Sequence, residues 1–138
     1  MTEPLPLTHG VDHVGLAVSD LEASSRFFCE CLGWHIVGGR PDYPAVFVGD
    51  GSVVVTLWQV EDPAACTPFD RRRNVGLHHL ALRVGSLDGL ALLHRRVGAW
   101  PGVTVEFAPT RSGTGPKTHF IVRDPSGVRI EFAFDPRT

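Results

Sequence analysis

Cysteine and long apolar runs are both scarce in this 138-residue chain. Its three cysteines, Cys29, Cys31 and Cys66, are an odd number without CxxC spacing, which argues against a disulfide framework and a cysteine-rich zinc knuckle and favours reduced thiols. No stretch approaches the roughly 18 apolar residues of a membrane span, and the N-terminus lacks the basic start and apolar run of a signal peptide. We therefore expect a cytoplasmic protein without a membrane partner.

The chain also lacks an excess of charge of either sign. A formal net charge of −2 gives no general attraction to nucleic acid, so we expect no such partner. One short basic cluster occupies residues 70–74, and a solvated linker is favoured there over a contact with a phosphate or an acidic substrate. Apolar residues, by contrast, make up 43% of the chain, which is enough for the core of a single domain over residues 1–138.

The most informative pattern is a repeat. The stretch VDHVGLAVSDL (11–21) recurs as LHHLALRVGSL (77–87), so that His13 aligns with His79. Repetition at about half the chain length predicts two similar modules. Each opens with a histidine on an alternating strand.

The order of elements is repeated as well. Ser19 with Glu22 forms a capping signature, and an apolar stripe that stops at Gly33 predicts a helix after the first strand. Module one (about 11–60) is predicted to contain a helix at 20–32 and strands at 12–18, 34–38, 45–49 and 53–59. A linker (about 61–76) follows. Module two (about 77–135) is predicted to contain a helix at 87–97 and strands at 77–84, 103–108, 118–122 and 128–134.

Strand periodicity identifies the side chains that can meet. His13 and His79 each lie on the less apolar face of their strand beside small residues, and Glu131 faces away from the core in the last strand. Two imidazoles and a carboxylate suit Fe(II), Mn(II), Zn(II), Ni(II) or Co(II), and they leave positions for a bidentate oxygen substrate. We therefore predict a divalent metal site at these three residues. His78 is the alternative to His79, although its phase matches the packed face.

Three motifs, DHVGLAVSDLEASSRFFCECLGW (12–34), LHHLALRV (77–84) and HFIVRDPSGVRIEF (119–132), resemble the paired signatures of the vicinal oxygen chelate superfamily. This superfamily includes glyoxalase I, methylmalonyl-CoA epimerase, extradiol dioxygenases, fosfomycin-resistance transferases and bleomycin-binding proteins. The resemblance covers about 11–135 and implies an α+β fold. Two tandem βαβββ modules would form an open, curled mixed β-sheet barrel with helices outside and a metal on the concave face. It also implies that His13, His79 and Glu131 are the ligands.

The chain departs from each branch of that superfamily. Aligning the two modules through Asp50 and Asp124 places Thr56 at the position of Glu131. Glyoxalase I enzymes usually carry another carboxylate or amide where this sequence has Thr56, and Gln59 would serve only if a bulge shifted the register. Ring-cleaving dioxygenases carry a tyrosine and a histidine where this chain has Ile121 and Ser112. Fosfomycin transferases place further basic residues after the glutamate, where this chain is nearly finished, and bleomycin-binding relatives generally lack the metal ligands.

Other residues are candidates for the same pocket. His119 is a candidate general acid or base, with a solvent-facing strand histidine as the alternative. Arg83 and Arg129 would bind an anionic substrate or pair with neighbouring carboxylates. Thr56, Trp58 and Phe47 are predicted to line the pocket on the module-one side, and the Gly-rich segment 109–117 is a candidate lid.

We therefore expect a metal-dependent lyase or isomerase acting on a small vicinal-oxygen metabolite. Two alternatives stay open, an Fe(II) extradiol-type dioxygenase and a natural-product or antibiotic binding protein without turnover. By analogy with small members of the superfamily we expect a homodimer. The two histidines and Glu131 would then meet either within one chain or across the dimer.

Overall fold

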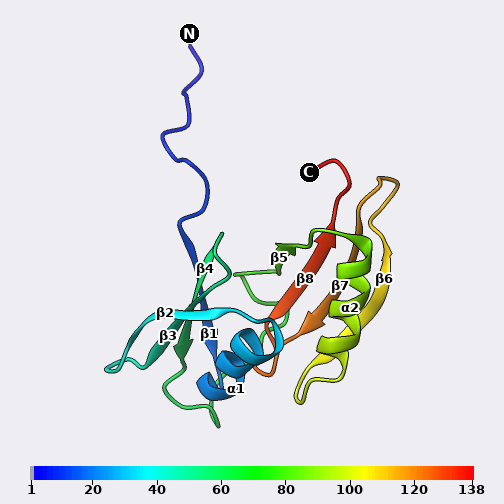
Figure 1. Ribbon diagram of the computed structural model, residues 1–138. Helices are drawn as coiled ribbons and strands as arrows, with labels where there is room; N and C mark the ends of the chain where they lie inside the picture. Colours follow the sequence, from blue (N-terminus) through cyan, green and yellow to red (C-terminus); the bar gives the residue numbers. More distant parts are fainter. Residues whose placement is uncertain (1) are drawn as a thin grey trace.

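The computed structural model describes residues 2–138 (Figure 1). The first half contains β1 (His13–Val18), α1 (Leu21–Arg26), a π-helical turn η1 (Phe27–Cys31), β2 (His35–Arg40), β3 (Ala45–Gly49) and β4 (Val54–Gln59). The second half contains β5 (Leu80–Arg83), α2 (Leu87–Gly98), β6 (Thr104–Arg111), β7 (Thr118–Arg123) and β8 (Arg129–Phe134).

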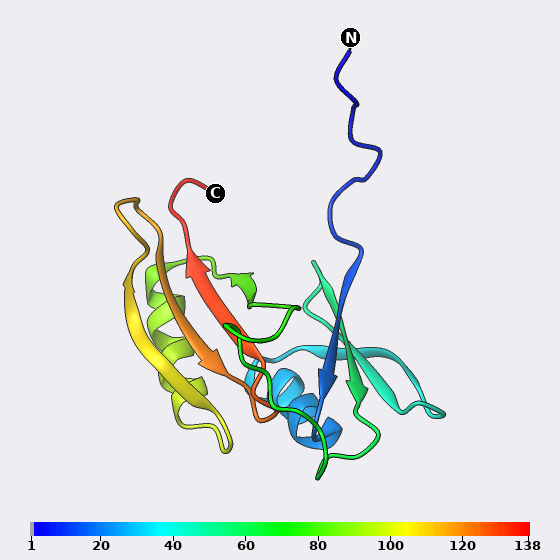
Figure 2. The same cartoon turned by 180° about the vertical axis from the view of Figure 1, so that it is seen from behind.

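Each half forms its own four-stranded mixed sheet, with the orders β1-β4-β3-β2 and β5-β8-β7-β6. The first and last strands of each module pair in parallel, and the other pairs are antiparallel. Helix α1 packs on the first sheet and α2 on the second, and both lie on the same side of the molecule (Figures 1 and 2). The predicted α+β fold of two tandem βαβββ modules with open, curled sheets is therefore confirmed.

The first helix differs from its prediction at both ends. Its N-cap is Asp20, whose carboxylate accepts a hydrogen bond from the amide of Ala23, so the prediction that Ser19 caps the helix was wrong. After Arg26 the helix continues as a π-helical turn, which adds a residue to the turn and buries Phe27 and Phe28 together. Gly33, at φ +78°, then ends the helix in the left-handed conformation that glycine adopts freely.

Two strand boundaries in module two also differ. The opening strand begins only at Leu80, so His79 lies just before the ladder instead of inside it. Strand β6 runs on to Arg111, so the first part of the predicted 109–117 loop is strand. The rest of that segment forms the turn of the β6–β7 hairpin, in which the amide of Ser112 donates to the carbonyl of Lys117 at 2.9 Å.

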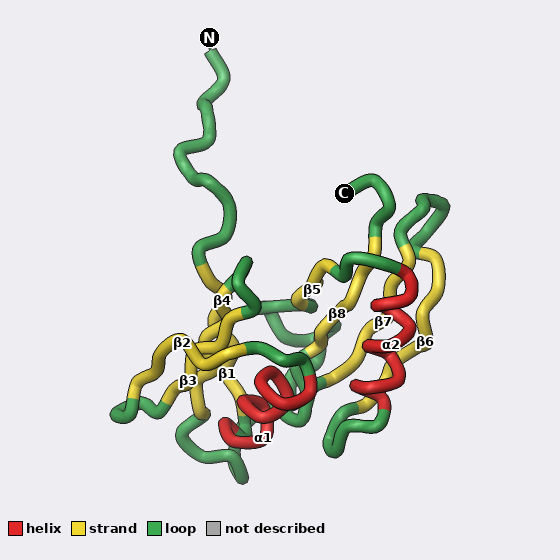
Figure 3. The backbone as a smooth tube through the Cα atoms, viewed as in Figure 1, coloured by secondary structure: helices red, strands yellow, loops and turns green. Residues whose placement is uncertain are grey.

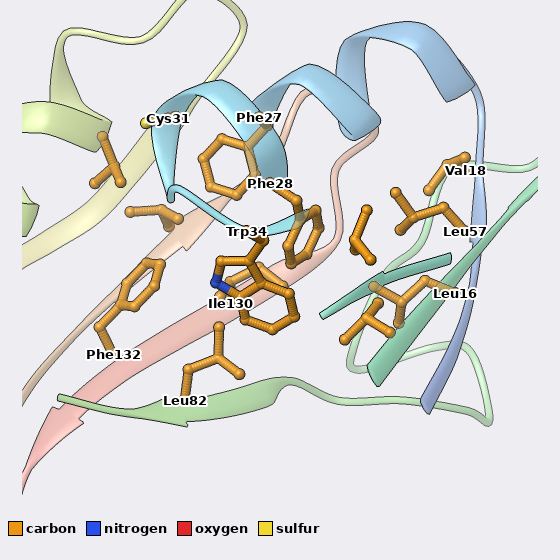
Figure 4. Close-up of a cluster of buried hydrophobic side chains, with 14 of the residues drawn as sticks. Leu16, Val18, Phe27, Phe28, Cys31, Trp34, Leu57, Leu82, Ile130 and Phe132 are labelled. Atoms are coloured by element: carbon orange, nitrogen blue, oxygen red, sulfur yellow. The ribbon is translucent and has the colours of Figure 1, made fainter. Parts of the chain in front are cut away.

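One apolar core joins the two modules (Figure 4). Phe27, Phe28 and Trp34 are fully or almost fully buried, and side chains of both sheets belong to the same cluster. The second module contributes Leu82, Leu90, Val97, Phe120, Val122, Ile130 and Phe132. The two sheets therefore share the apolar surface that stabilises them.

A buried carboxylate fastens the two modules at one end. Asp124, 2% exposed, follows β7 and accepts hydrogen bonds from the Ser24 hydroxyl of α1 at 2.9 Å and from the amides of Ser126 and Val128. The Ser126 hydroxyl lies 2.8 Å from that of Ser24 and also accepts from the amide of Ser19. Burial raises the pKa of Asp124 above its usual value, and these donors partly offset that effect.

The connection between the modules is a long exposed segment without helix or strand (Figures 2 and 3). All three cysteines are free, which agrees with the expected thiols. Among residues 2–138, no helix has the length and apolar character needed to cross a bilayer.

Candidate functional site

The two sheets repeat not only their strand order but also their register. In module one Gly15 of β1 pairs with Thr56 of β4, and in module two Ala81 of β5 pairs with Glu131 of β8. Gly15 and Ala81 each lie two residues after the repeated histidine. Thr56 therefore occupies the position in module one that Glu131 occupies in module two, as the sequence alignment predicted.

Glu131 is the centre of a cluster of titratable side chains. Its Oε1 atom lies 3.0 Å from Nδ1 of His119 on β7 and 4.0 Å from Nε2 of His79. The side chains of Glu131 and His119 are only 12% and 16% exposed, whereas His79 is 37% exposed. The ring of His119 also packs against Phe107, with 5.2 Å between the ring centroids. Three of the predicted site residues, His79, His119 and Glu131, are thus brought close together in module two.

His13 stands apart from this cluster. It begins β1 in the first sheet, its side chain is 54% exposed, and its Nδ1 lies 2.7 Å from the carboxylate of Asp12. Within residues 2–138 it makes no hydrogen bond or ion pair with His79, His119 or Glu131. No group of three or more His, Cys, Asp or Glu side chains in this part of the chain is arranged to hold a metal ion.

The other predicted residues of module one form an aromatic face. Trp58 donates from its indole nitrogen to the Thr56 hydroxyl at 2.8 Å, and its ring contacts Tyr43 and Phe47 at centroid distances of 4.6 and 5.7 Å. A Cβ on Gly15 would come within 3.2 Å of the Thr56 hydroxyl, so glycine leaves room for this hydrogen bond. Thr56, Trp58 and Phe47 thus lie together on one face, and none of the three is titratable. That they line a substrate pocket stays a prediction.

The Gln59 side chain bonds to the backbone at the start of α1, and no bulge shifts it toward the candidate site. Its amide oxygen accepts from the backbone N–H of Leu21 at 2.9 Å, and its amide nitrogen donates to the carbonyl of Ser19 at 2.8 Å. Strand β4 pairs with β1 without a register shift. Gln59 therefore holds the start of α1, and it would have to give up both contacts to reach a metal.

Arg129 is committed to a neighbouring carboxylate. Its guanidinium donates to both oxygens of Glu106 on β6, at 2.9 and 3.0 Å, and also to the carbonyl of His78 at 3.1 Å. The hydrogen bonds from Arg129 hold the pKa of Glu106 below its usual value despite burial. Of the two alternatives for Arg129, the structure therefore shows the ion pair.

His78 is held between its neighbours. Its Nδ1 lies 2.8 Å from that of His79 and 3.1 Å from the Arg129 guanidinium. Desolvation, followed by the nearby positive charge of Arg129, lowers the pKa of His78, which favours the neutral imidazole. Arg83 lines a small cavity of about 190 Å³ together with Lys117 and Glu131.

Two larger cavities lie under the linker. One, of about 680 Å³, is bordered by Gly15 and Ala17 of β1, by Val128 and by apolar linker residues such as Phe69 and Val75. The other, of about 670 Å³, lies between the linker and the ends of β7 and β8, where arginines gather. Neither cavity is lined by Glu131.

Sequence reasoning missed two features of this region. Glu106 was not recognised, because its contact with Arg129 crosses β7 and so depends on the order of strands in the sheet. The fastening role of Asp124 was also missed, although the turn signal DPSG and its counterpart Asp50 were visible in the repeat.

The fold and the register define a class of protein. The family model described as the Glyoxalase/Bleomycin resistance protein/Dioxygenase superfamily matches residues 10–132, so the chain belongs to this superfamily. This confirms the resemblance seen in the sequence.

Individual proteins are similar to this chain over most of its length. The chain is 31% identical over 136 residues to the uncharacterized protein YwkD of Bacillus subtilis (strain 168), covering 94% of this chain and 91% of the relative. The crystal structure of a glyoxylase/bleomycin resistance protein/dioxygenase domain from Frankia sp. EAN1pec matches with a TM-score of 0.77 and 28% identity, covering 92% and 98% of the two chains. The fold is also similar to that of a lactoylglutathione lyase from Agrobacterium tumefaciens, with a TM-score of 0.70 and 21% identity over 94% of this chain and 96% of that chain.

Proposed function

We propose that this protein is a divalent-metal-dependent enzyme of lyase or isomerase type that acts on a small metabolite with neighbouring oxygens. The observation that supports this proposal is the meeting of His79 and His119 at Glu131 on the curled sheet of module two. Glu131 and His79 would supply two donors of a carboxylate and two-imidazole set, a combination that suits Fe, Mn, Zn, Ni or Co.

The residues proposed to hold the ion are His13, His79 and Glu131. Both histidine contacts of Glu131 involve Oε1, which leaves Oε2 for a ligand. A divalent ion bound there would polarise a carbonyl and stabilise the negative charge of an enediolate. Thr56, at the equivalent place in module one, has a neutral hydroxyl already bonded to Trp58 and is not proposed as a ligand.

His119 is proposed to move the proton. Its Nδ1 is engaged by Glu131, and a neutral ring that donates from Nδ1 carries a lone pair on Nε2. That nitrogen would accept a proton from the substrate and later donate it to the intermediate to form the product. Packing against Phe107 holds the ring in place for this role.

His13 is proposed to come from a second copy of the chain. In a single chain it pairs with Asp12 and makes no contact with the Glu131 cluster. A homodimer in which β1 of one chain faces β8 of the other would complete the ligand set without rearranging either module.

Metal analysis after native purification tests the proposal directly. His79→Ala and Glu131→Gln should each weaken metal binding by about 10- to 100-fold or more, because each removes one of three protein ligands. His78→Ala and Thr56→Ala are the matched controls, and both should keep the wild-type stoichiometry. Circular dichroism should show all four variants folded. Unchanged metal content in His79→Ala and Glu131→Gln would contradict the site.

A mixing experiment tests whether the site is shared between chains. His13→Ala and Glu131→Gln would be unfolded together and refolded, and metal bound per chain would be compared with that of each variant alone. If the site crosses the dimer, a mixed dimer carries one intact and one doubly altered site, so part of the metal binding returns. If all three ligands come from one chain, each site in the mixture lacks a ligand and nothing returns.

A binding protein without turnover is the second candidate, and the apolar-lined cavity of about 680 Å³ under the linker favours it. Protein purified under native conditions that holds no metal, and gains none when ions are added, would support this candidate. The dioxygenase alternative is tested by oxygen consumption with a panel of catechols after anaerobic iron loading.

A further inference from the structure

The second large cavity carries a concentration of positive charge that the proposed chemistry does not use. It lies between the linker and the ends of β7 and β8 and has a volume of about 670 Å³. Four arginines line it, two from the linker (Arg71 and Arg73) and two from the sheet (Arg123 and Arg129). The carboxylate of Asp70 and the neutral side chains of Thr67 and Asn74 complete its polar lining.

The carboxylates near this cavity neutralise only part of that charge. Glu106 pairs with Arg129 through two hydrogen bonds and lies 3.9 Å from Nε of Arg123. Asp70 is the carboxylate within the lining itself, so the four guanidinium groups, counted with Asp70 and Glu106, carry a net charge of +2. Within residues 2–138, neither Arg71 nor Arg73 forms an ion pair or a side-chain hydrogen bond.

The electrostatics of Glu106 support this account. After its hydrogen bonds with Arg129, the charges of Arg129, Arg71 and Arg123 each lower the pKa of Glu106. Arg71 therefore lies close enough to act on the same carboxylate as the two sheet arginines. A cavity wall with surplus guanidinium groups attracts oxyanions.

Hydrogen bonds within residues 70–74 of the linker form a turn that contains Arg71 and Arg73. The Asp70 carboxylate accepts from the amide of Arg72 at 2.9 Å, and the Asp70 carbonyl accepts from the amides of Arg73 and Asn74 at 3.1 and 2.8 Å. The Asn74 side chain closes the turn by accepting from the amide of Asp70 at 2.6 Å. Arg71 and Arg73 line the cavity while Arg72, between them, does not.

We propose that this cavity is a binding site for a small dianionic oxyanion, a phosphate or a dicarboxylate. Guanidinium groups bind both kinds of group through paired hydrogen bonds, and a double negative charge matches the surplus of the wall. Arg129 and Glu131 are two residues apart on β8, so the anion site lies about 7 Å along the strand from the proposed metal ligand. The anion site depends on Arg71 and Arg73 of the linker, and binding there does not require the metal.

Calorimetric titration of the full chain with inorganic phosphate and, separately, with succinate tests the inference at neutral pH and low salt. We expect wild-type protein to bind at least one of the two anions. Arg71→Ala and Arg73→Ala should each weaken that binding by about tenfold, because each removes a charge-assisted pair of hydrogen bonds. Which anion binds more tightly identifies the group that the cavity prefers.

Arg72→Ala is the matched control, because it removes the same charge from the same turn without altering the cavity wall. It should bind the anion within about twofold of wild type. Equal weakening in all three arginine variants would overturn the proposal, because it would indicate only non-specific electrostatic attraction between the basic segment and an anion. The proposal would also fail if wild-type protein bound neither anion.

Glu131→Gln separates this inference from the proposed enzyme activity. It should lose the metal and keep the anion, whereas Arg73→Ala should keep the metal and lose the anion. If Glu131→Gln retains its metal while the arginine variants lose the anion, the metal proposal fails and the anion site survives. If the arginine variants bind the anion as wild type does, the anion site fails independently of the metal.

Discussion

The two modules have the same plan, but they present different chemistry at the same register positions. Module one places Thr56 where module two places Glu131, and it surrounds that residue with Trp58, Phe47 and Tyr43. Module two places His79 and His119 beside its carboxylate, so the cluster of titratable side chains at this register position lies in module two. Module one has an aromatic face at that position, and His13 lies apart from the cluster. A duplicated scaffold can therefore carry different side chains at equivalent positions without changing its strand order.

The same contrast appears in the turns before the closing strands. Asp50 and Asp124 occupy equivalent positions, and each accepts two backbone amide hydrogens. Asp50 is exposed, whereas Asp124 is buried and also binds Ser24 of the other module. In the described part of the chain, the Asp50 carboxylate bonds only within its own hairpin turn, whereas the Asp124 carboxylate also links module two to module one.

The largest effect should come from breaking that fastening. Asp124→Ala should lower the free energy of unfolding by about 3 kcal/mol, because the buried hydroxyl of Ser24 and two amides lose their acceptor. Asp50→Ala, the matched variant of module one, should cost about 1 kcal/mol because its donors can turn to water. Urea denaturation measures both values, and equal losses would contradict the difference between the turns.

The sign of the Asp124 contribution can be checked with pH. Because burial raises its pKa, the native carboxyl keeps its proton to a higher pH than the unfolded chain does. Wild-type stability should therefore fall as pH rises from the unfolded to the native pKa. Asp124→Asn should not show this fall, and a wild-type stability that rose across that interval would oppose the assignment.

Glu106 gives the next largest effect, and module one has no counterpart because Val54 occupies the position of Arg129. Glu106→Gln should cost about 2 kcal/mol at neutral pH by leaving the Arg129 guanidinium, 8% exposed, without its partner. Since the native pKa of Glu106 is lowered, this stabilisation is present above the unfolded pKa and disappears as pH falls through the native one. Denaturation from neutral to acid pH measures the change.

Glu61→Gln, an exposed change of the same type in the linker, is the control for Glu106→Gln. It should leave stability unchanged within about 0.5 kcal/mol at every pH. A difference between wild type and Glu106→Gln that stayed constant down to strongly acid pH would mean that the carboxylate charge has no part in it.

The smallest effect is expected on the aromatic face of module one. Trp58→Phe removes the hydrogen bond to Thr56 and should cost about 1 kcal/mol. Thr56→Ala should cost about as much, and the double variant little more than either alone, because all three changes break the same bond. Thermal unfolding of the four proteins completes this cycle, and strictly additive losses would show that the two side chains act separately.

Local pattern was enough to predict much of this molecule. The alternation in β1 and β8 and the repeated histidine identified the strand faces, so the equivalence of Thr56 and Glu131 was visible in the sequence. Contacts between residues of one strand or one turn depend on the short-range alternation of apolar and polar residues, which can be read directly from the sequence.

Contacts across strands and between modules were harder to predict. The Arg129–Glu106 pair spans two strand spacings, and the Asp124–Ser24 bond joins residues a hundred positions apart in the chain. The proposed ligand set has the same difficulty, because His13 lies on one sheet and Glu131 on the other. Periodicity shows which face a side chain occupies but not which distant face lies opposite.

The shared core has a consequence for how the chain folds. Each sheet is built only from strands of its own half, so the first half can form its hydrogen-bond ladders before the second half has left the ribosome. The large side chains Phe27, Phe28 and Trp34 of the first half would nevertheless stay partly exposed to solvent until second-half residues of the shared core, such as Ile130, are available (Figure 4). Neither half is therefore expected to persist as an isolated fragment, and the repeat is one cooperative unit instead of two independent ones.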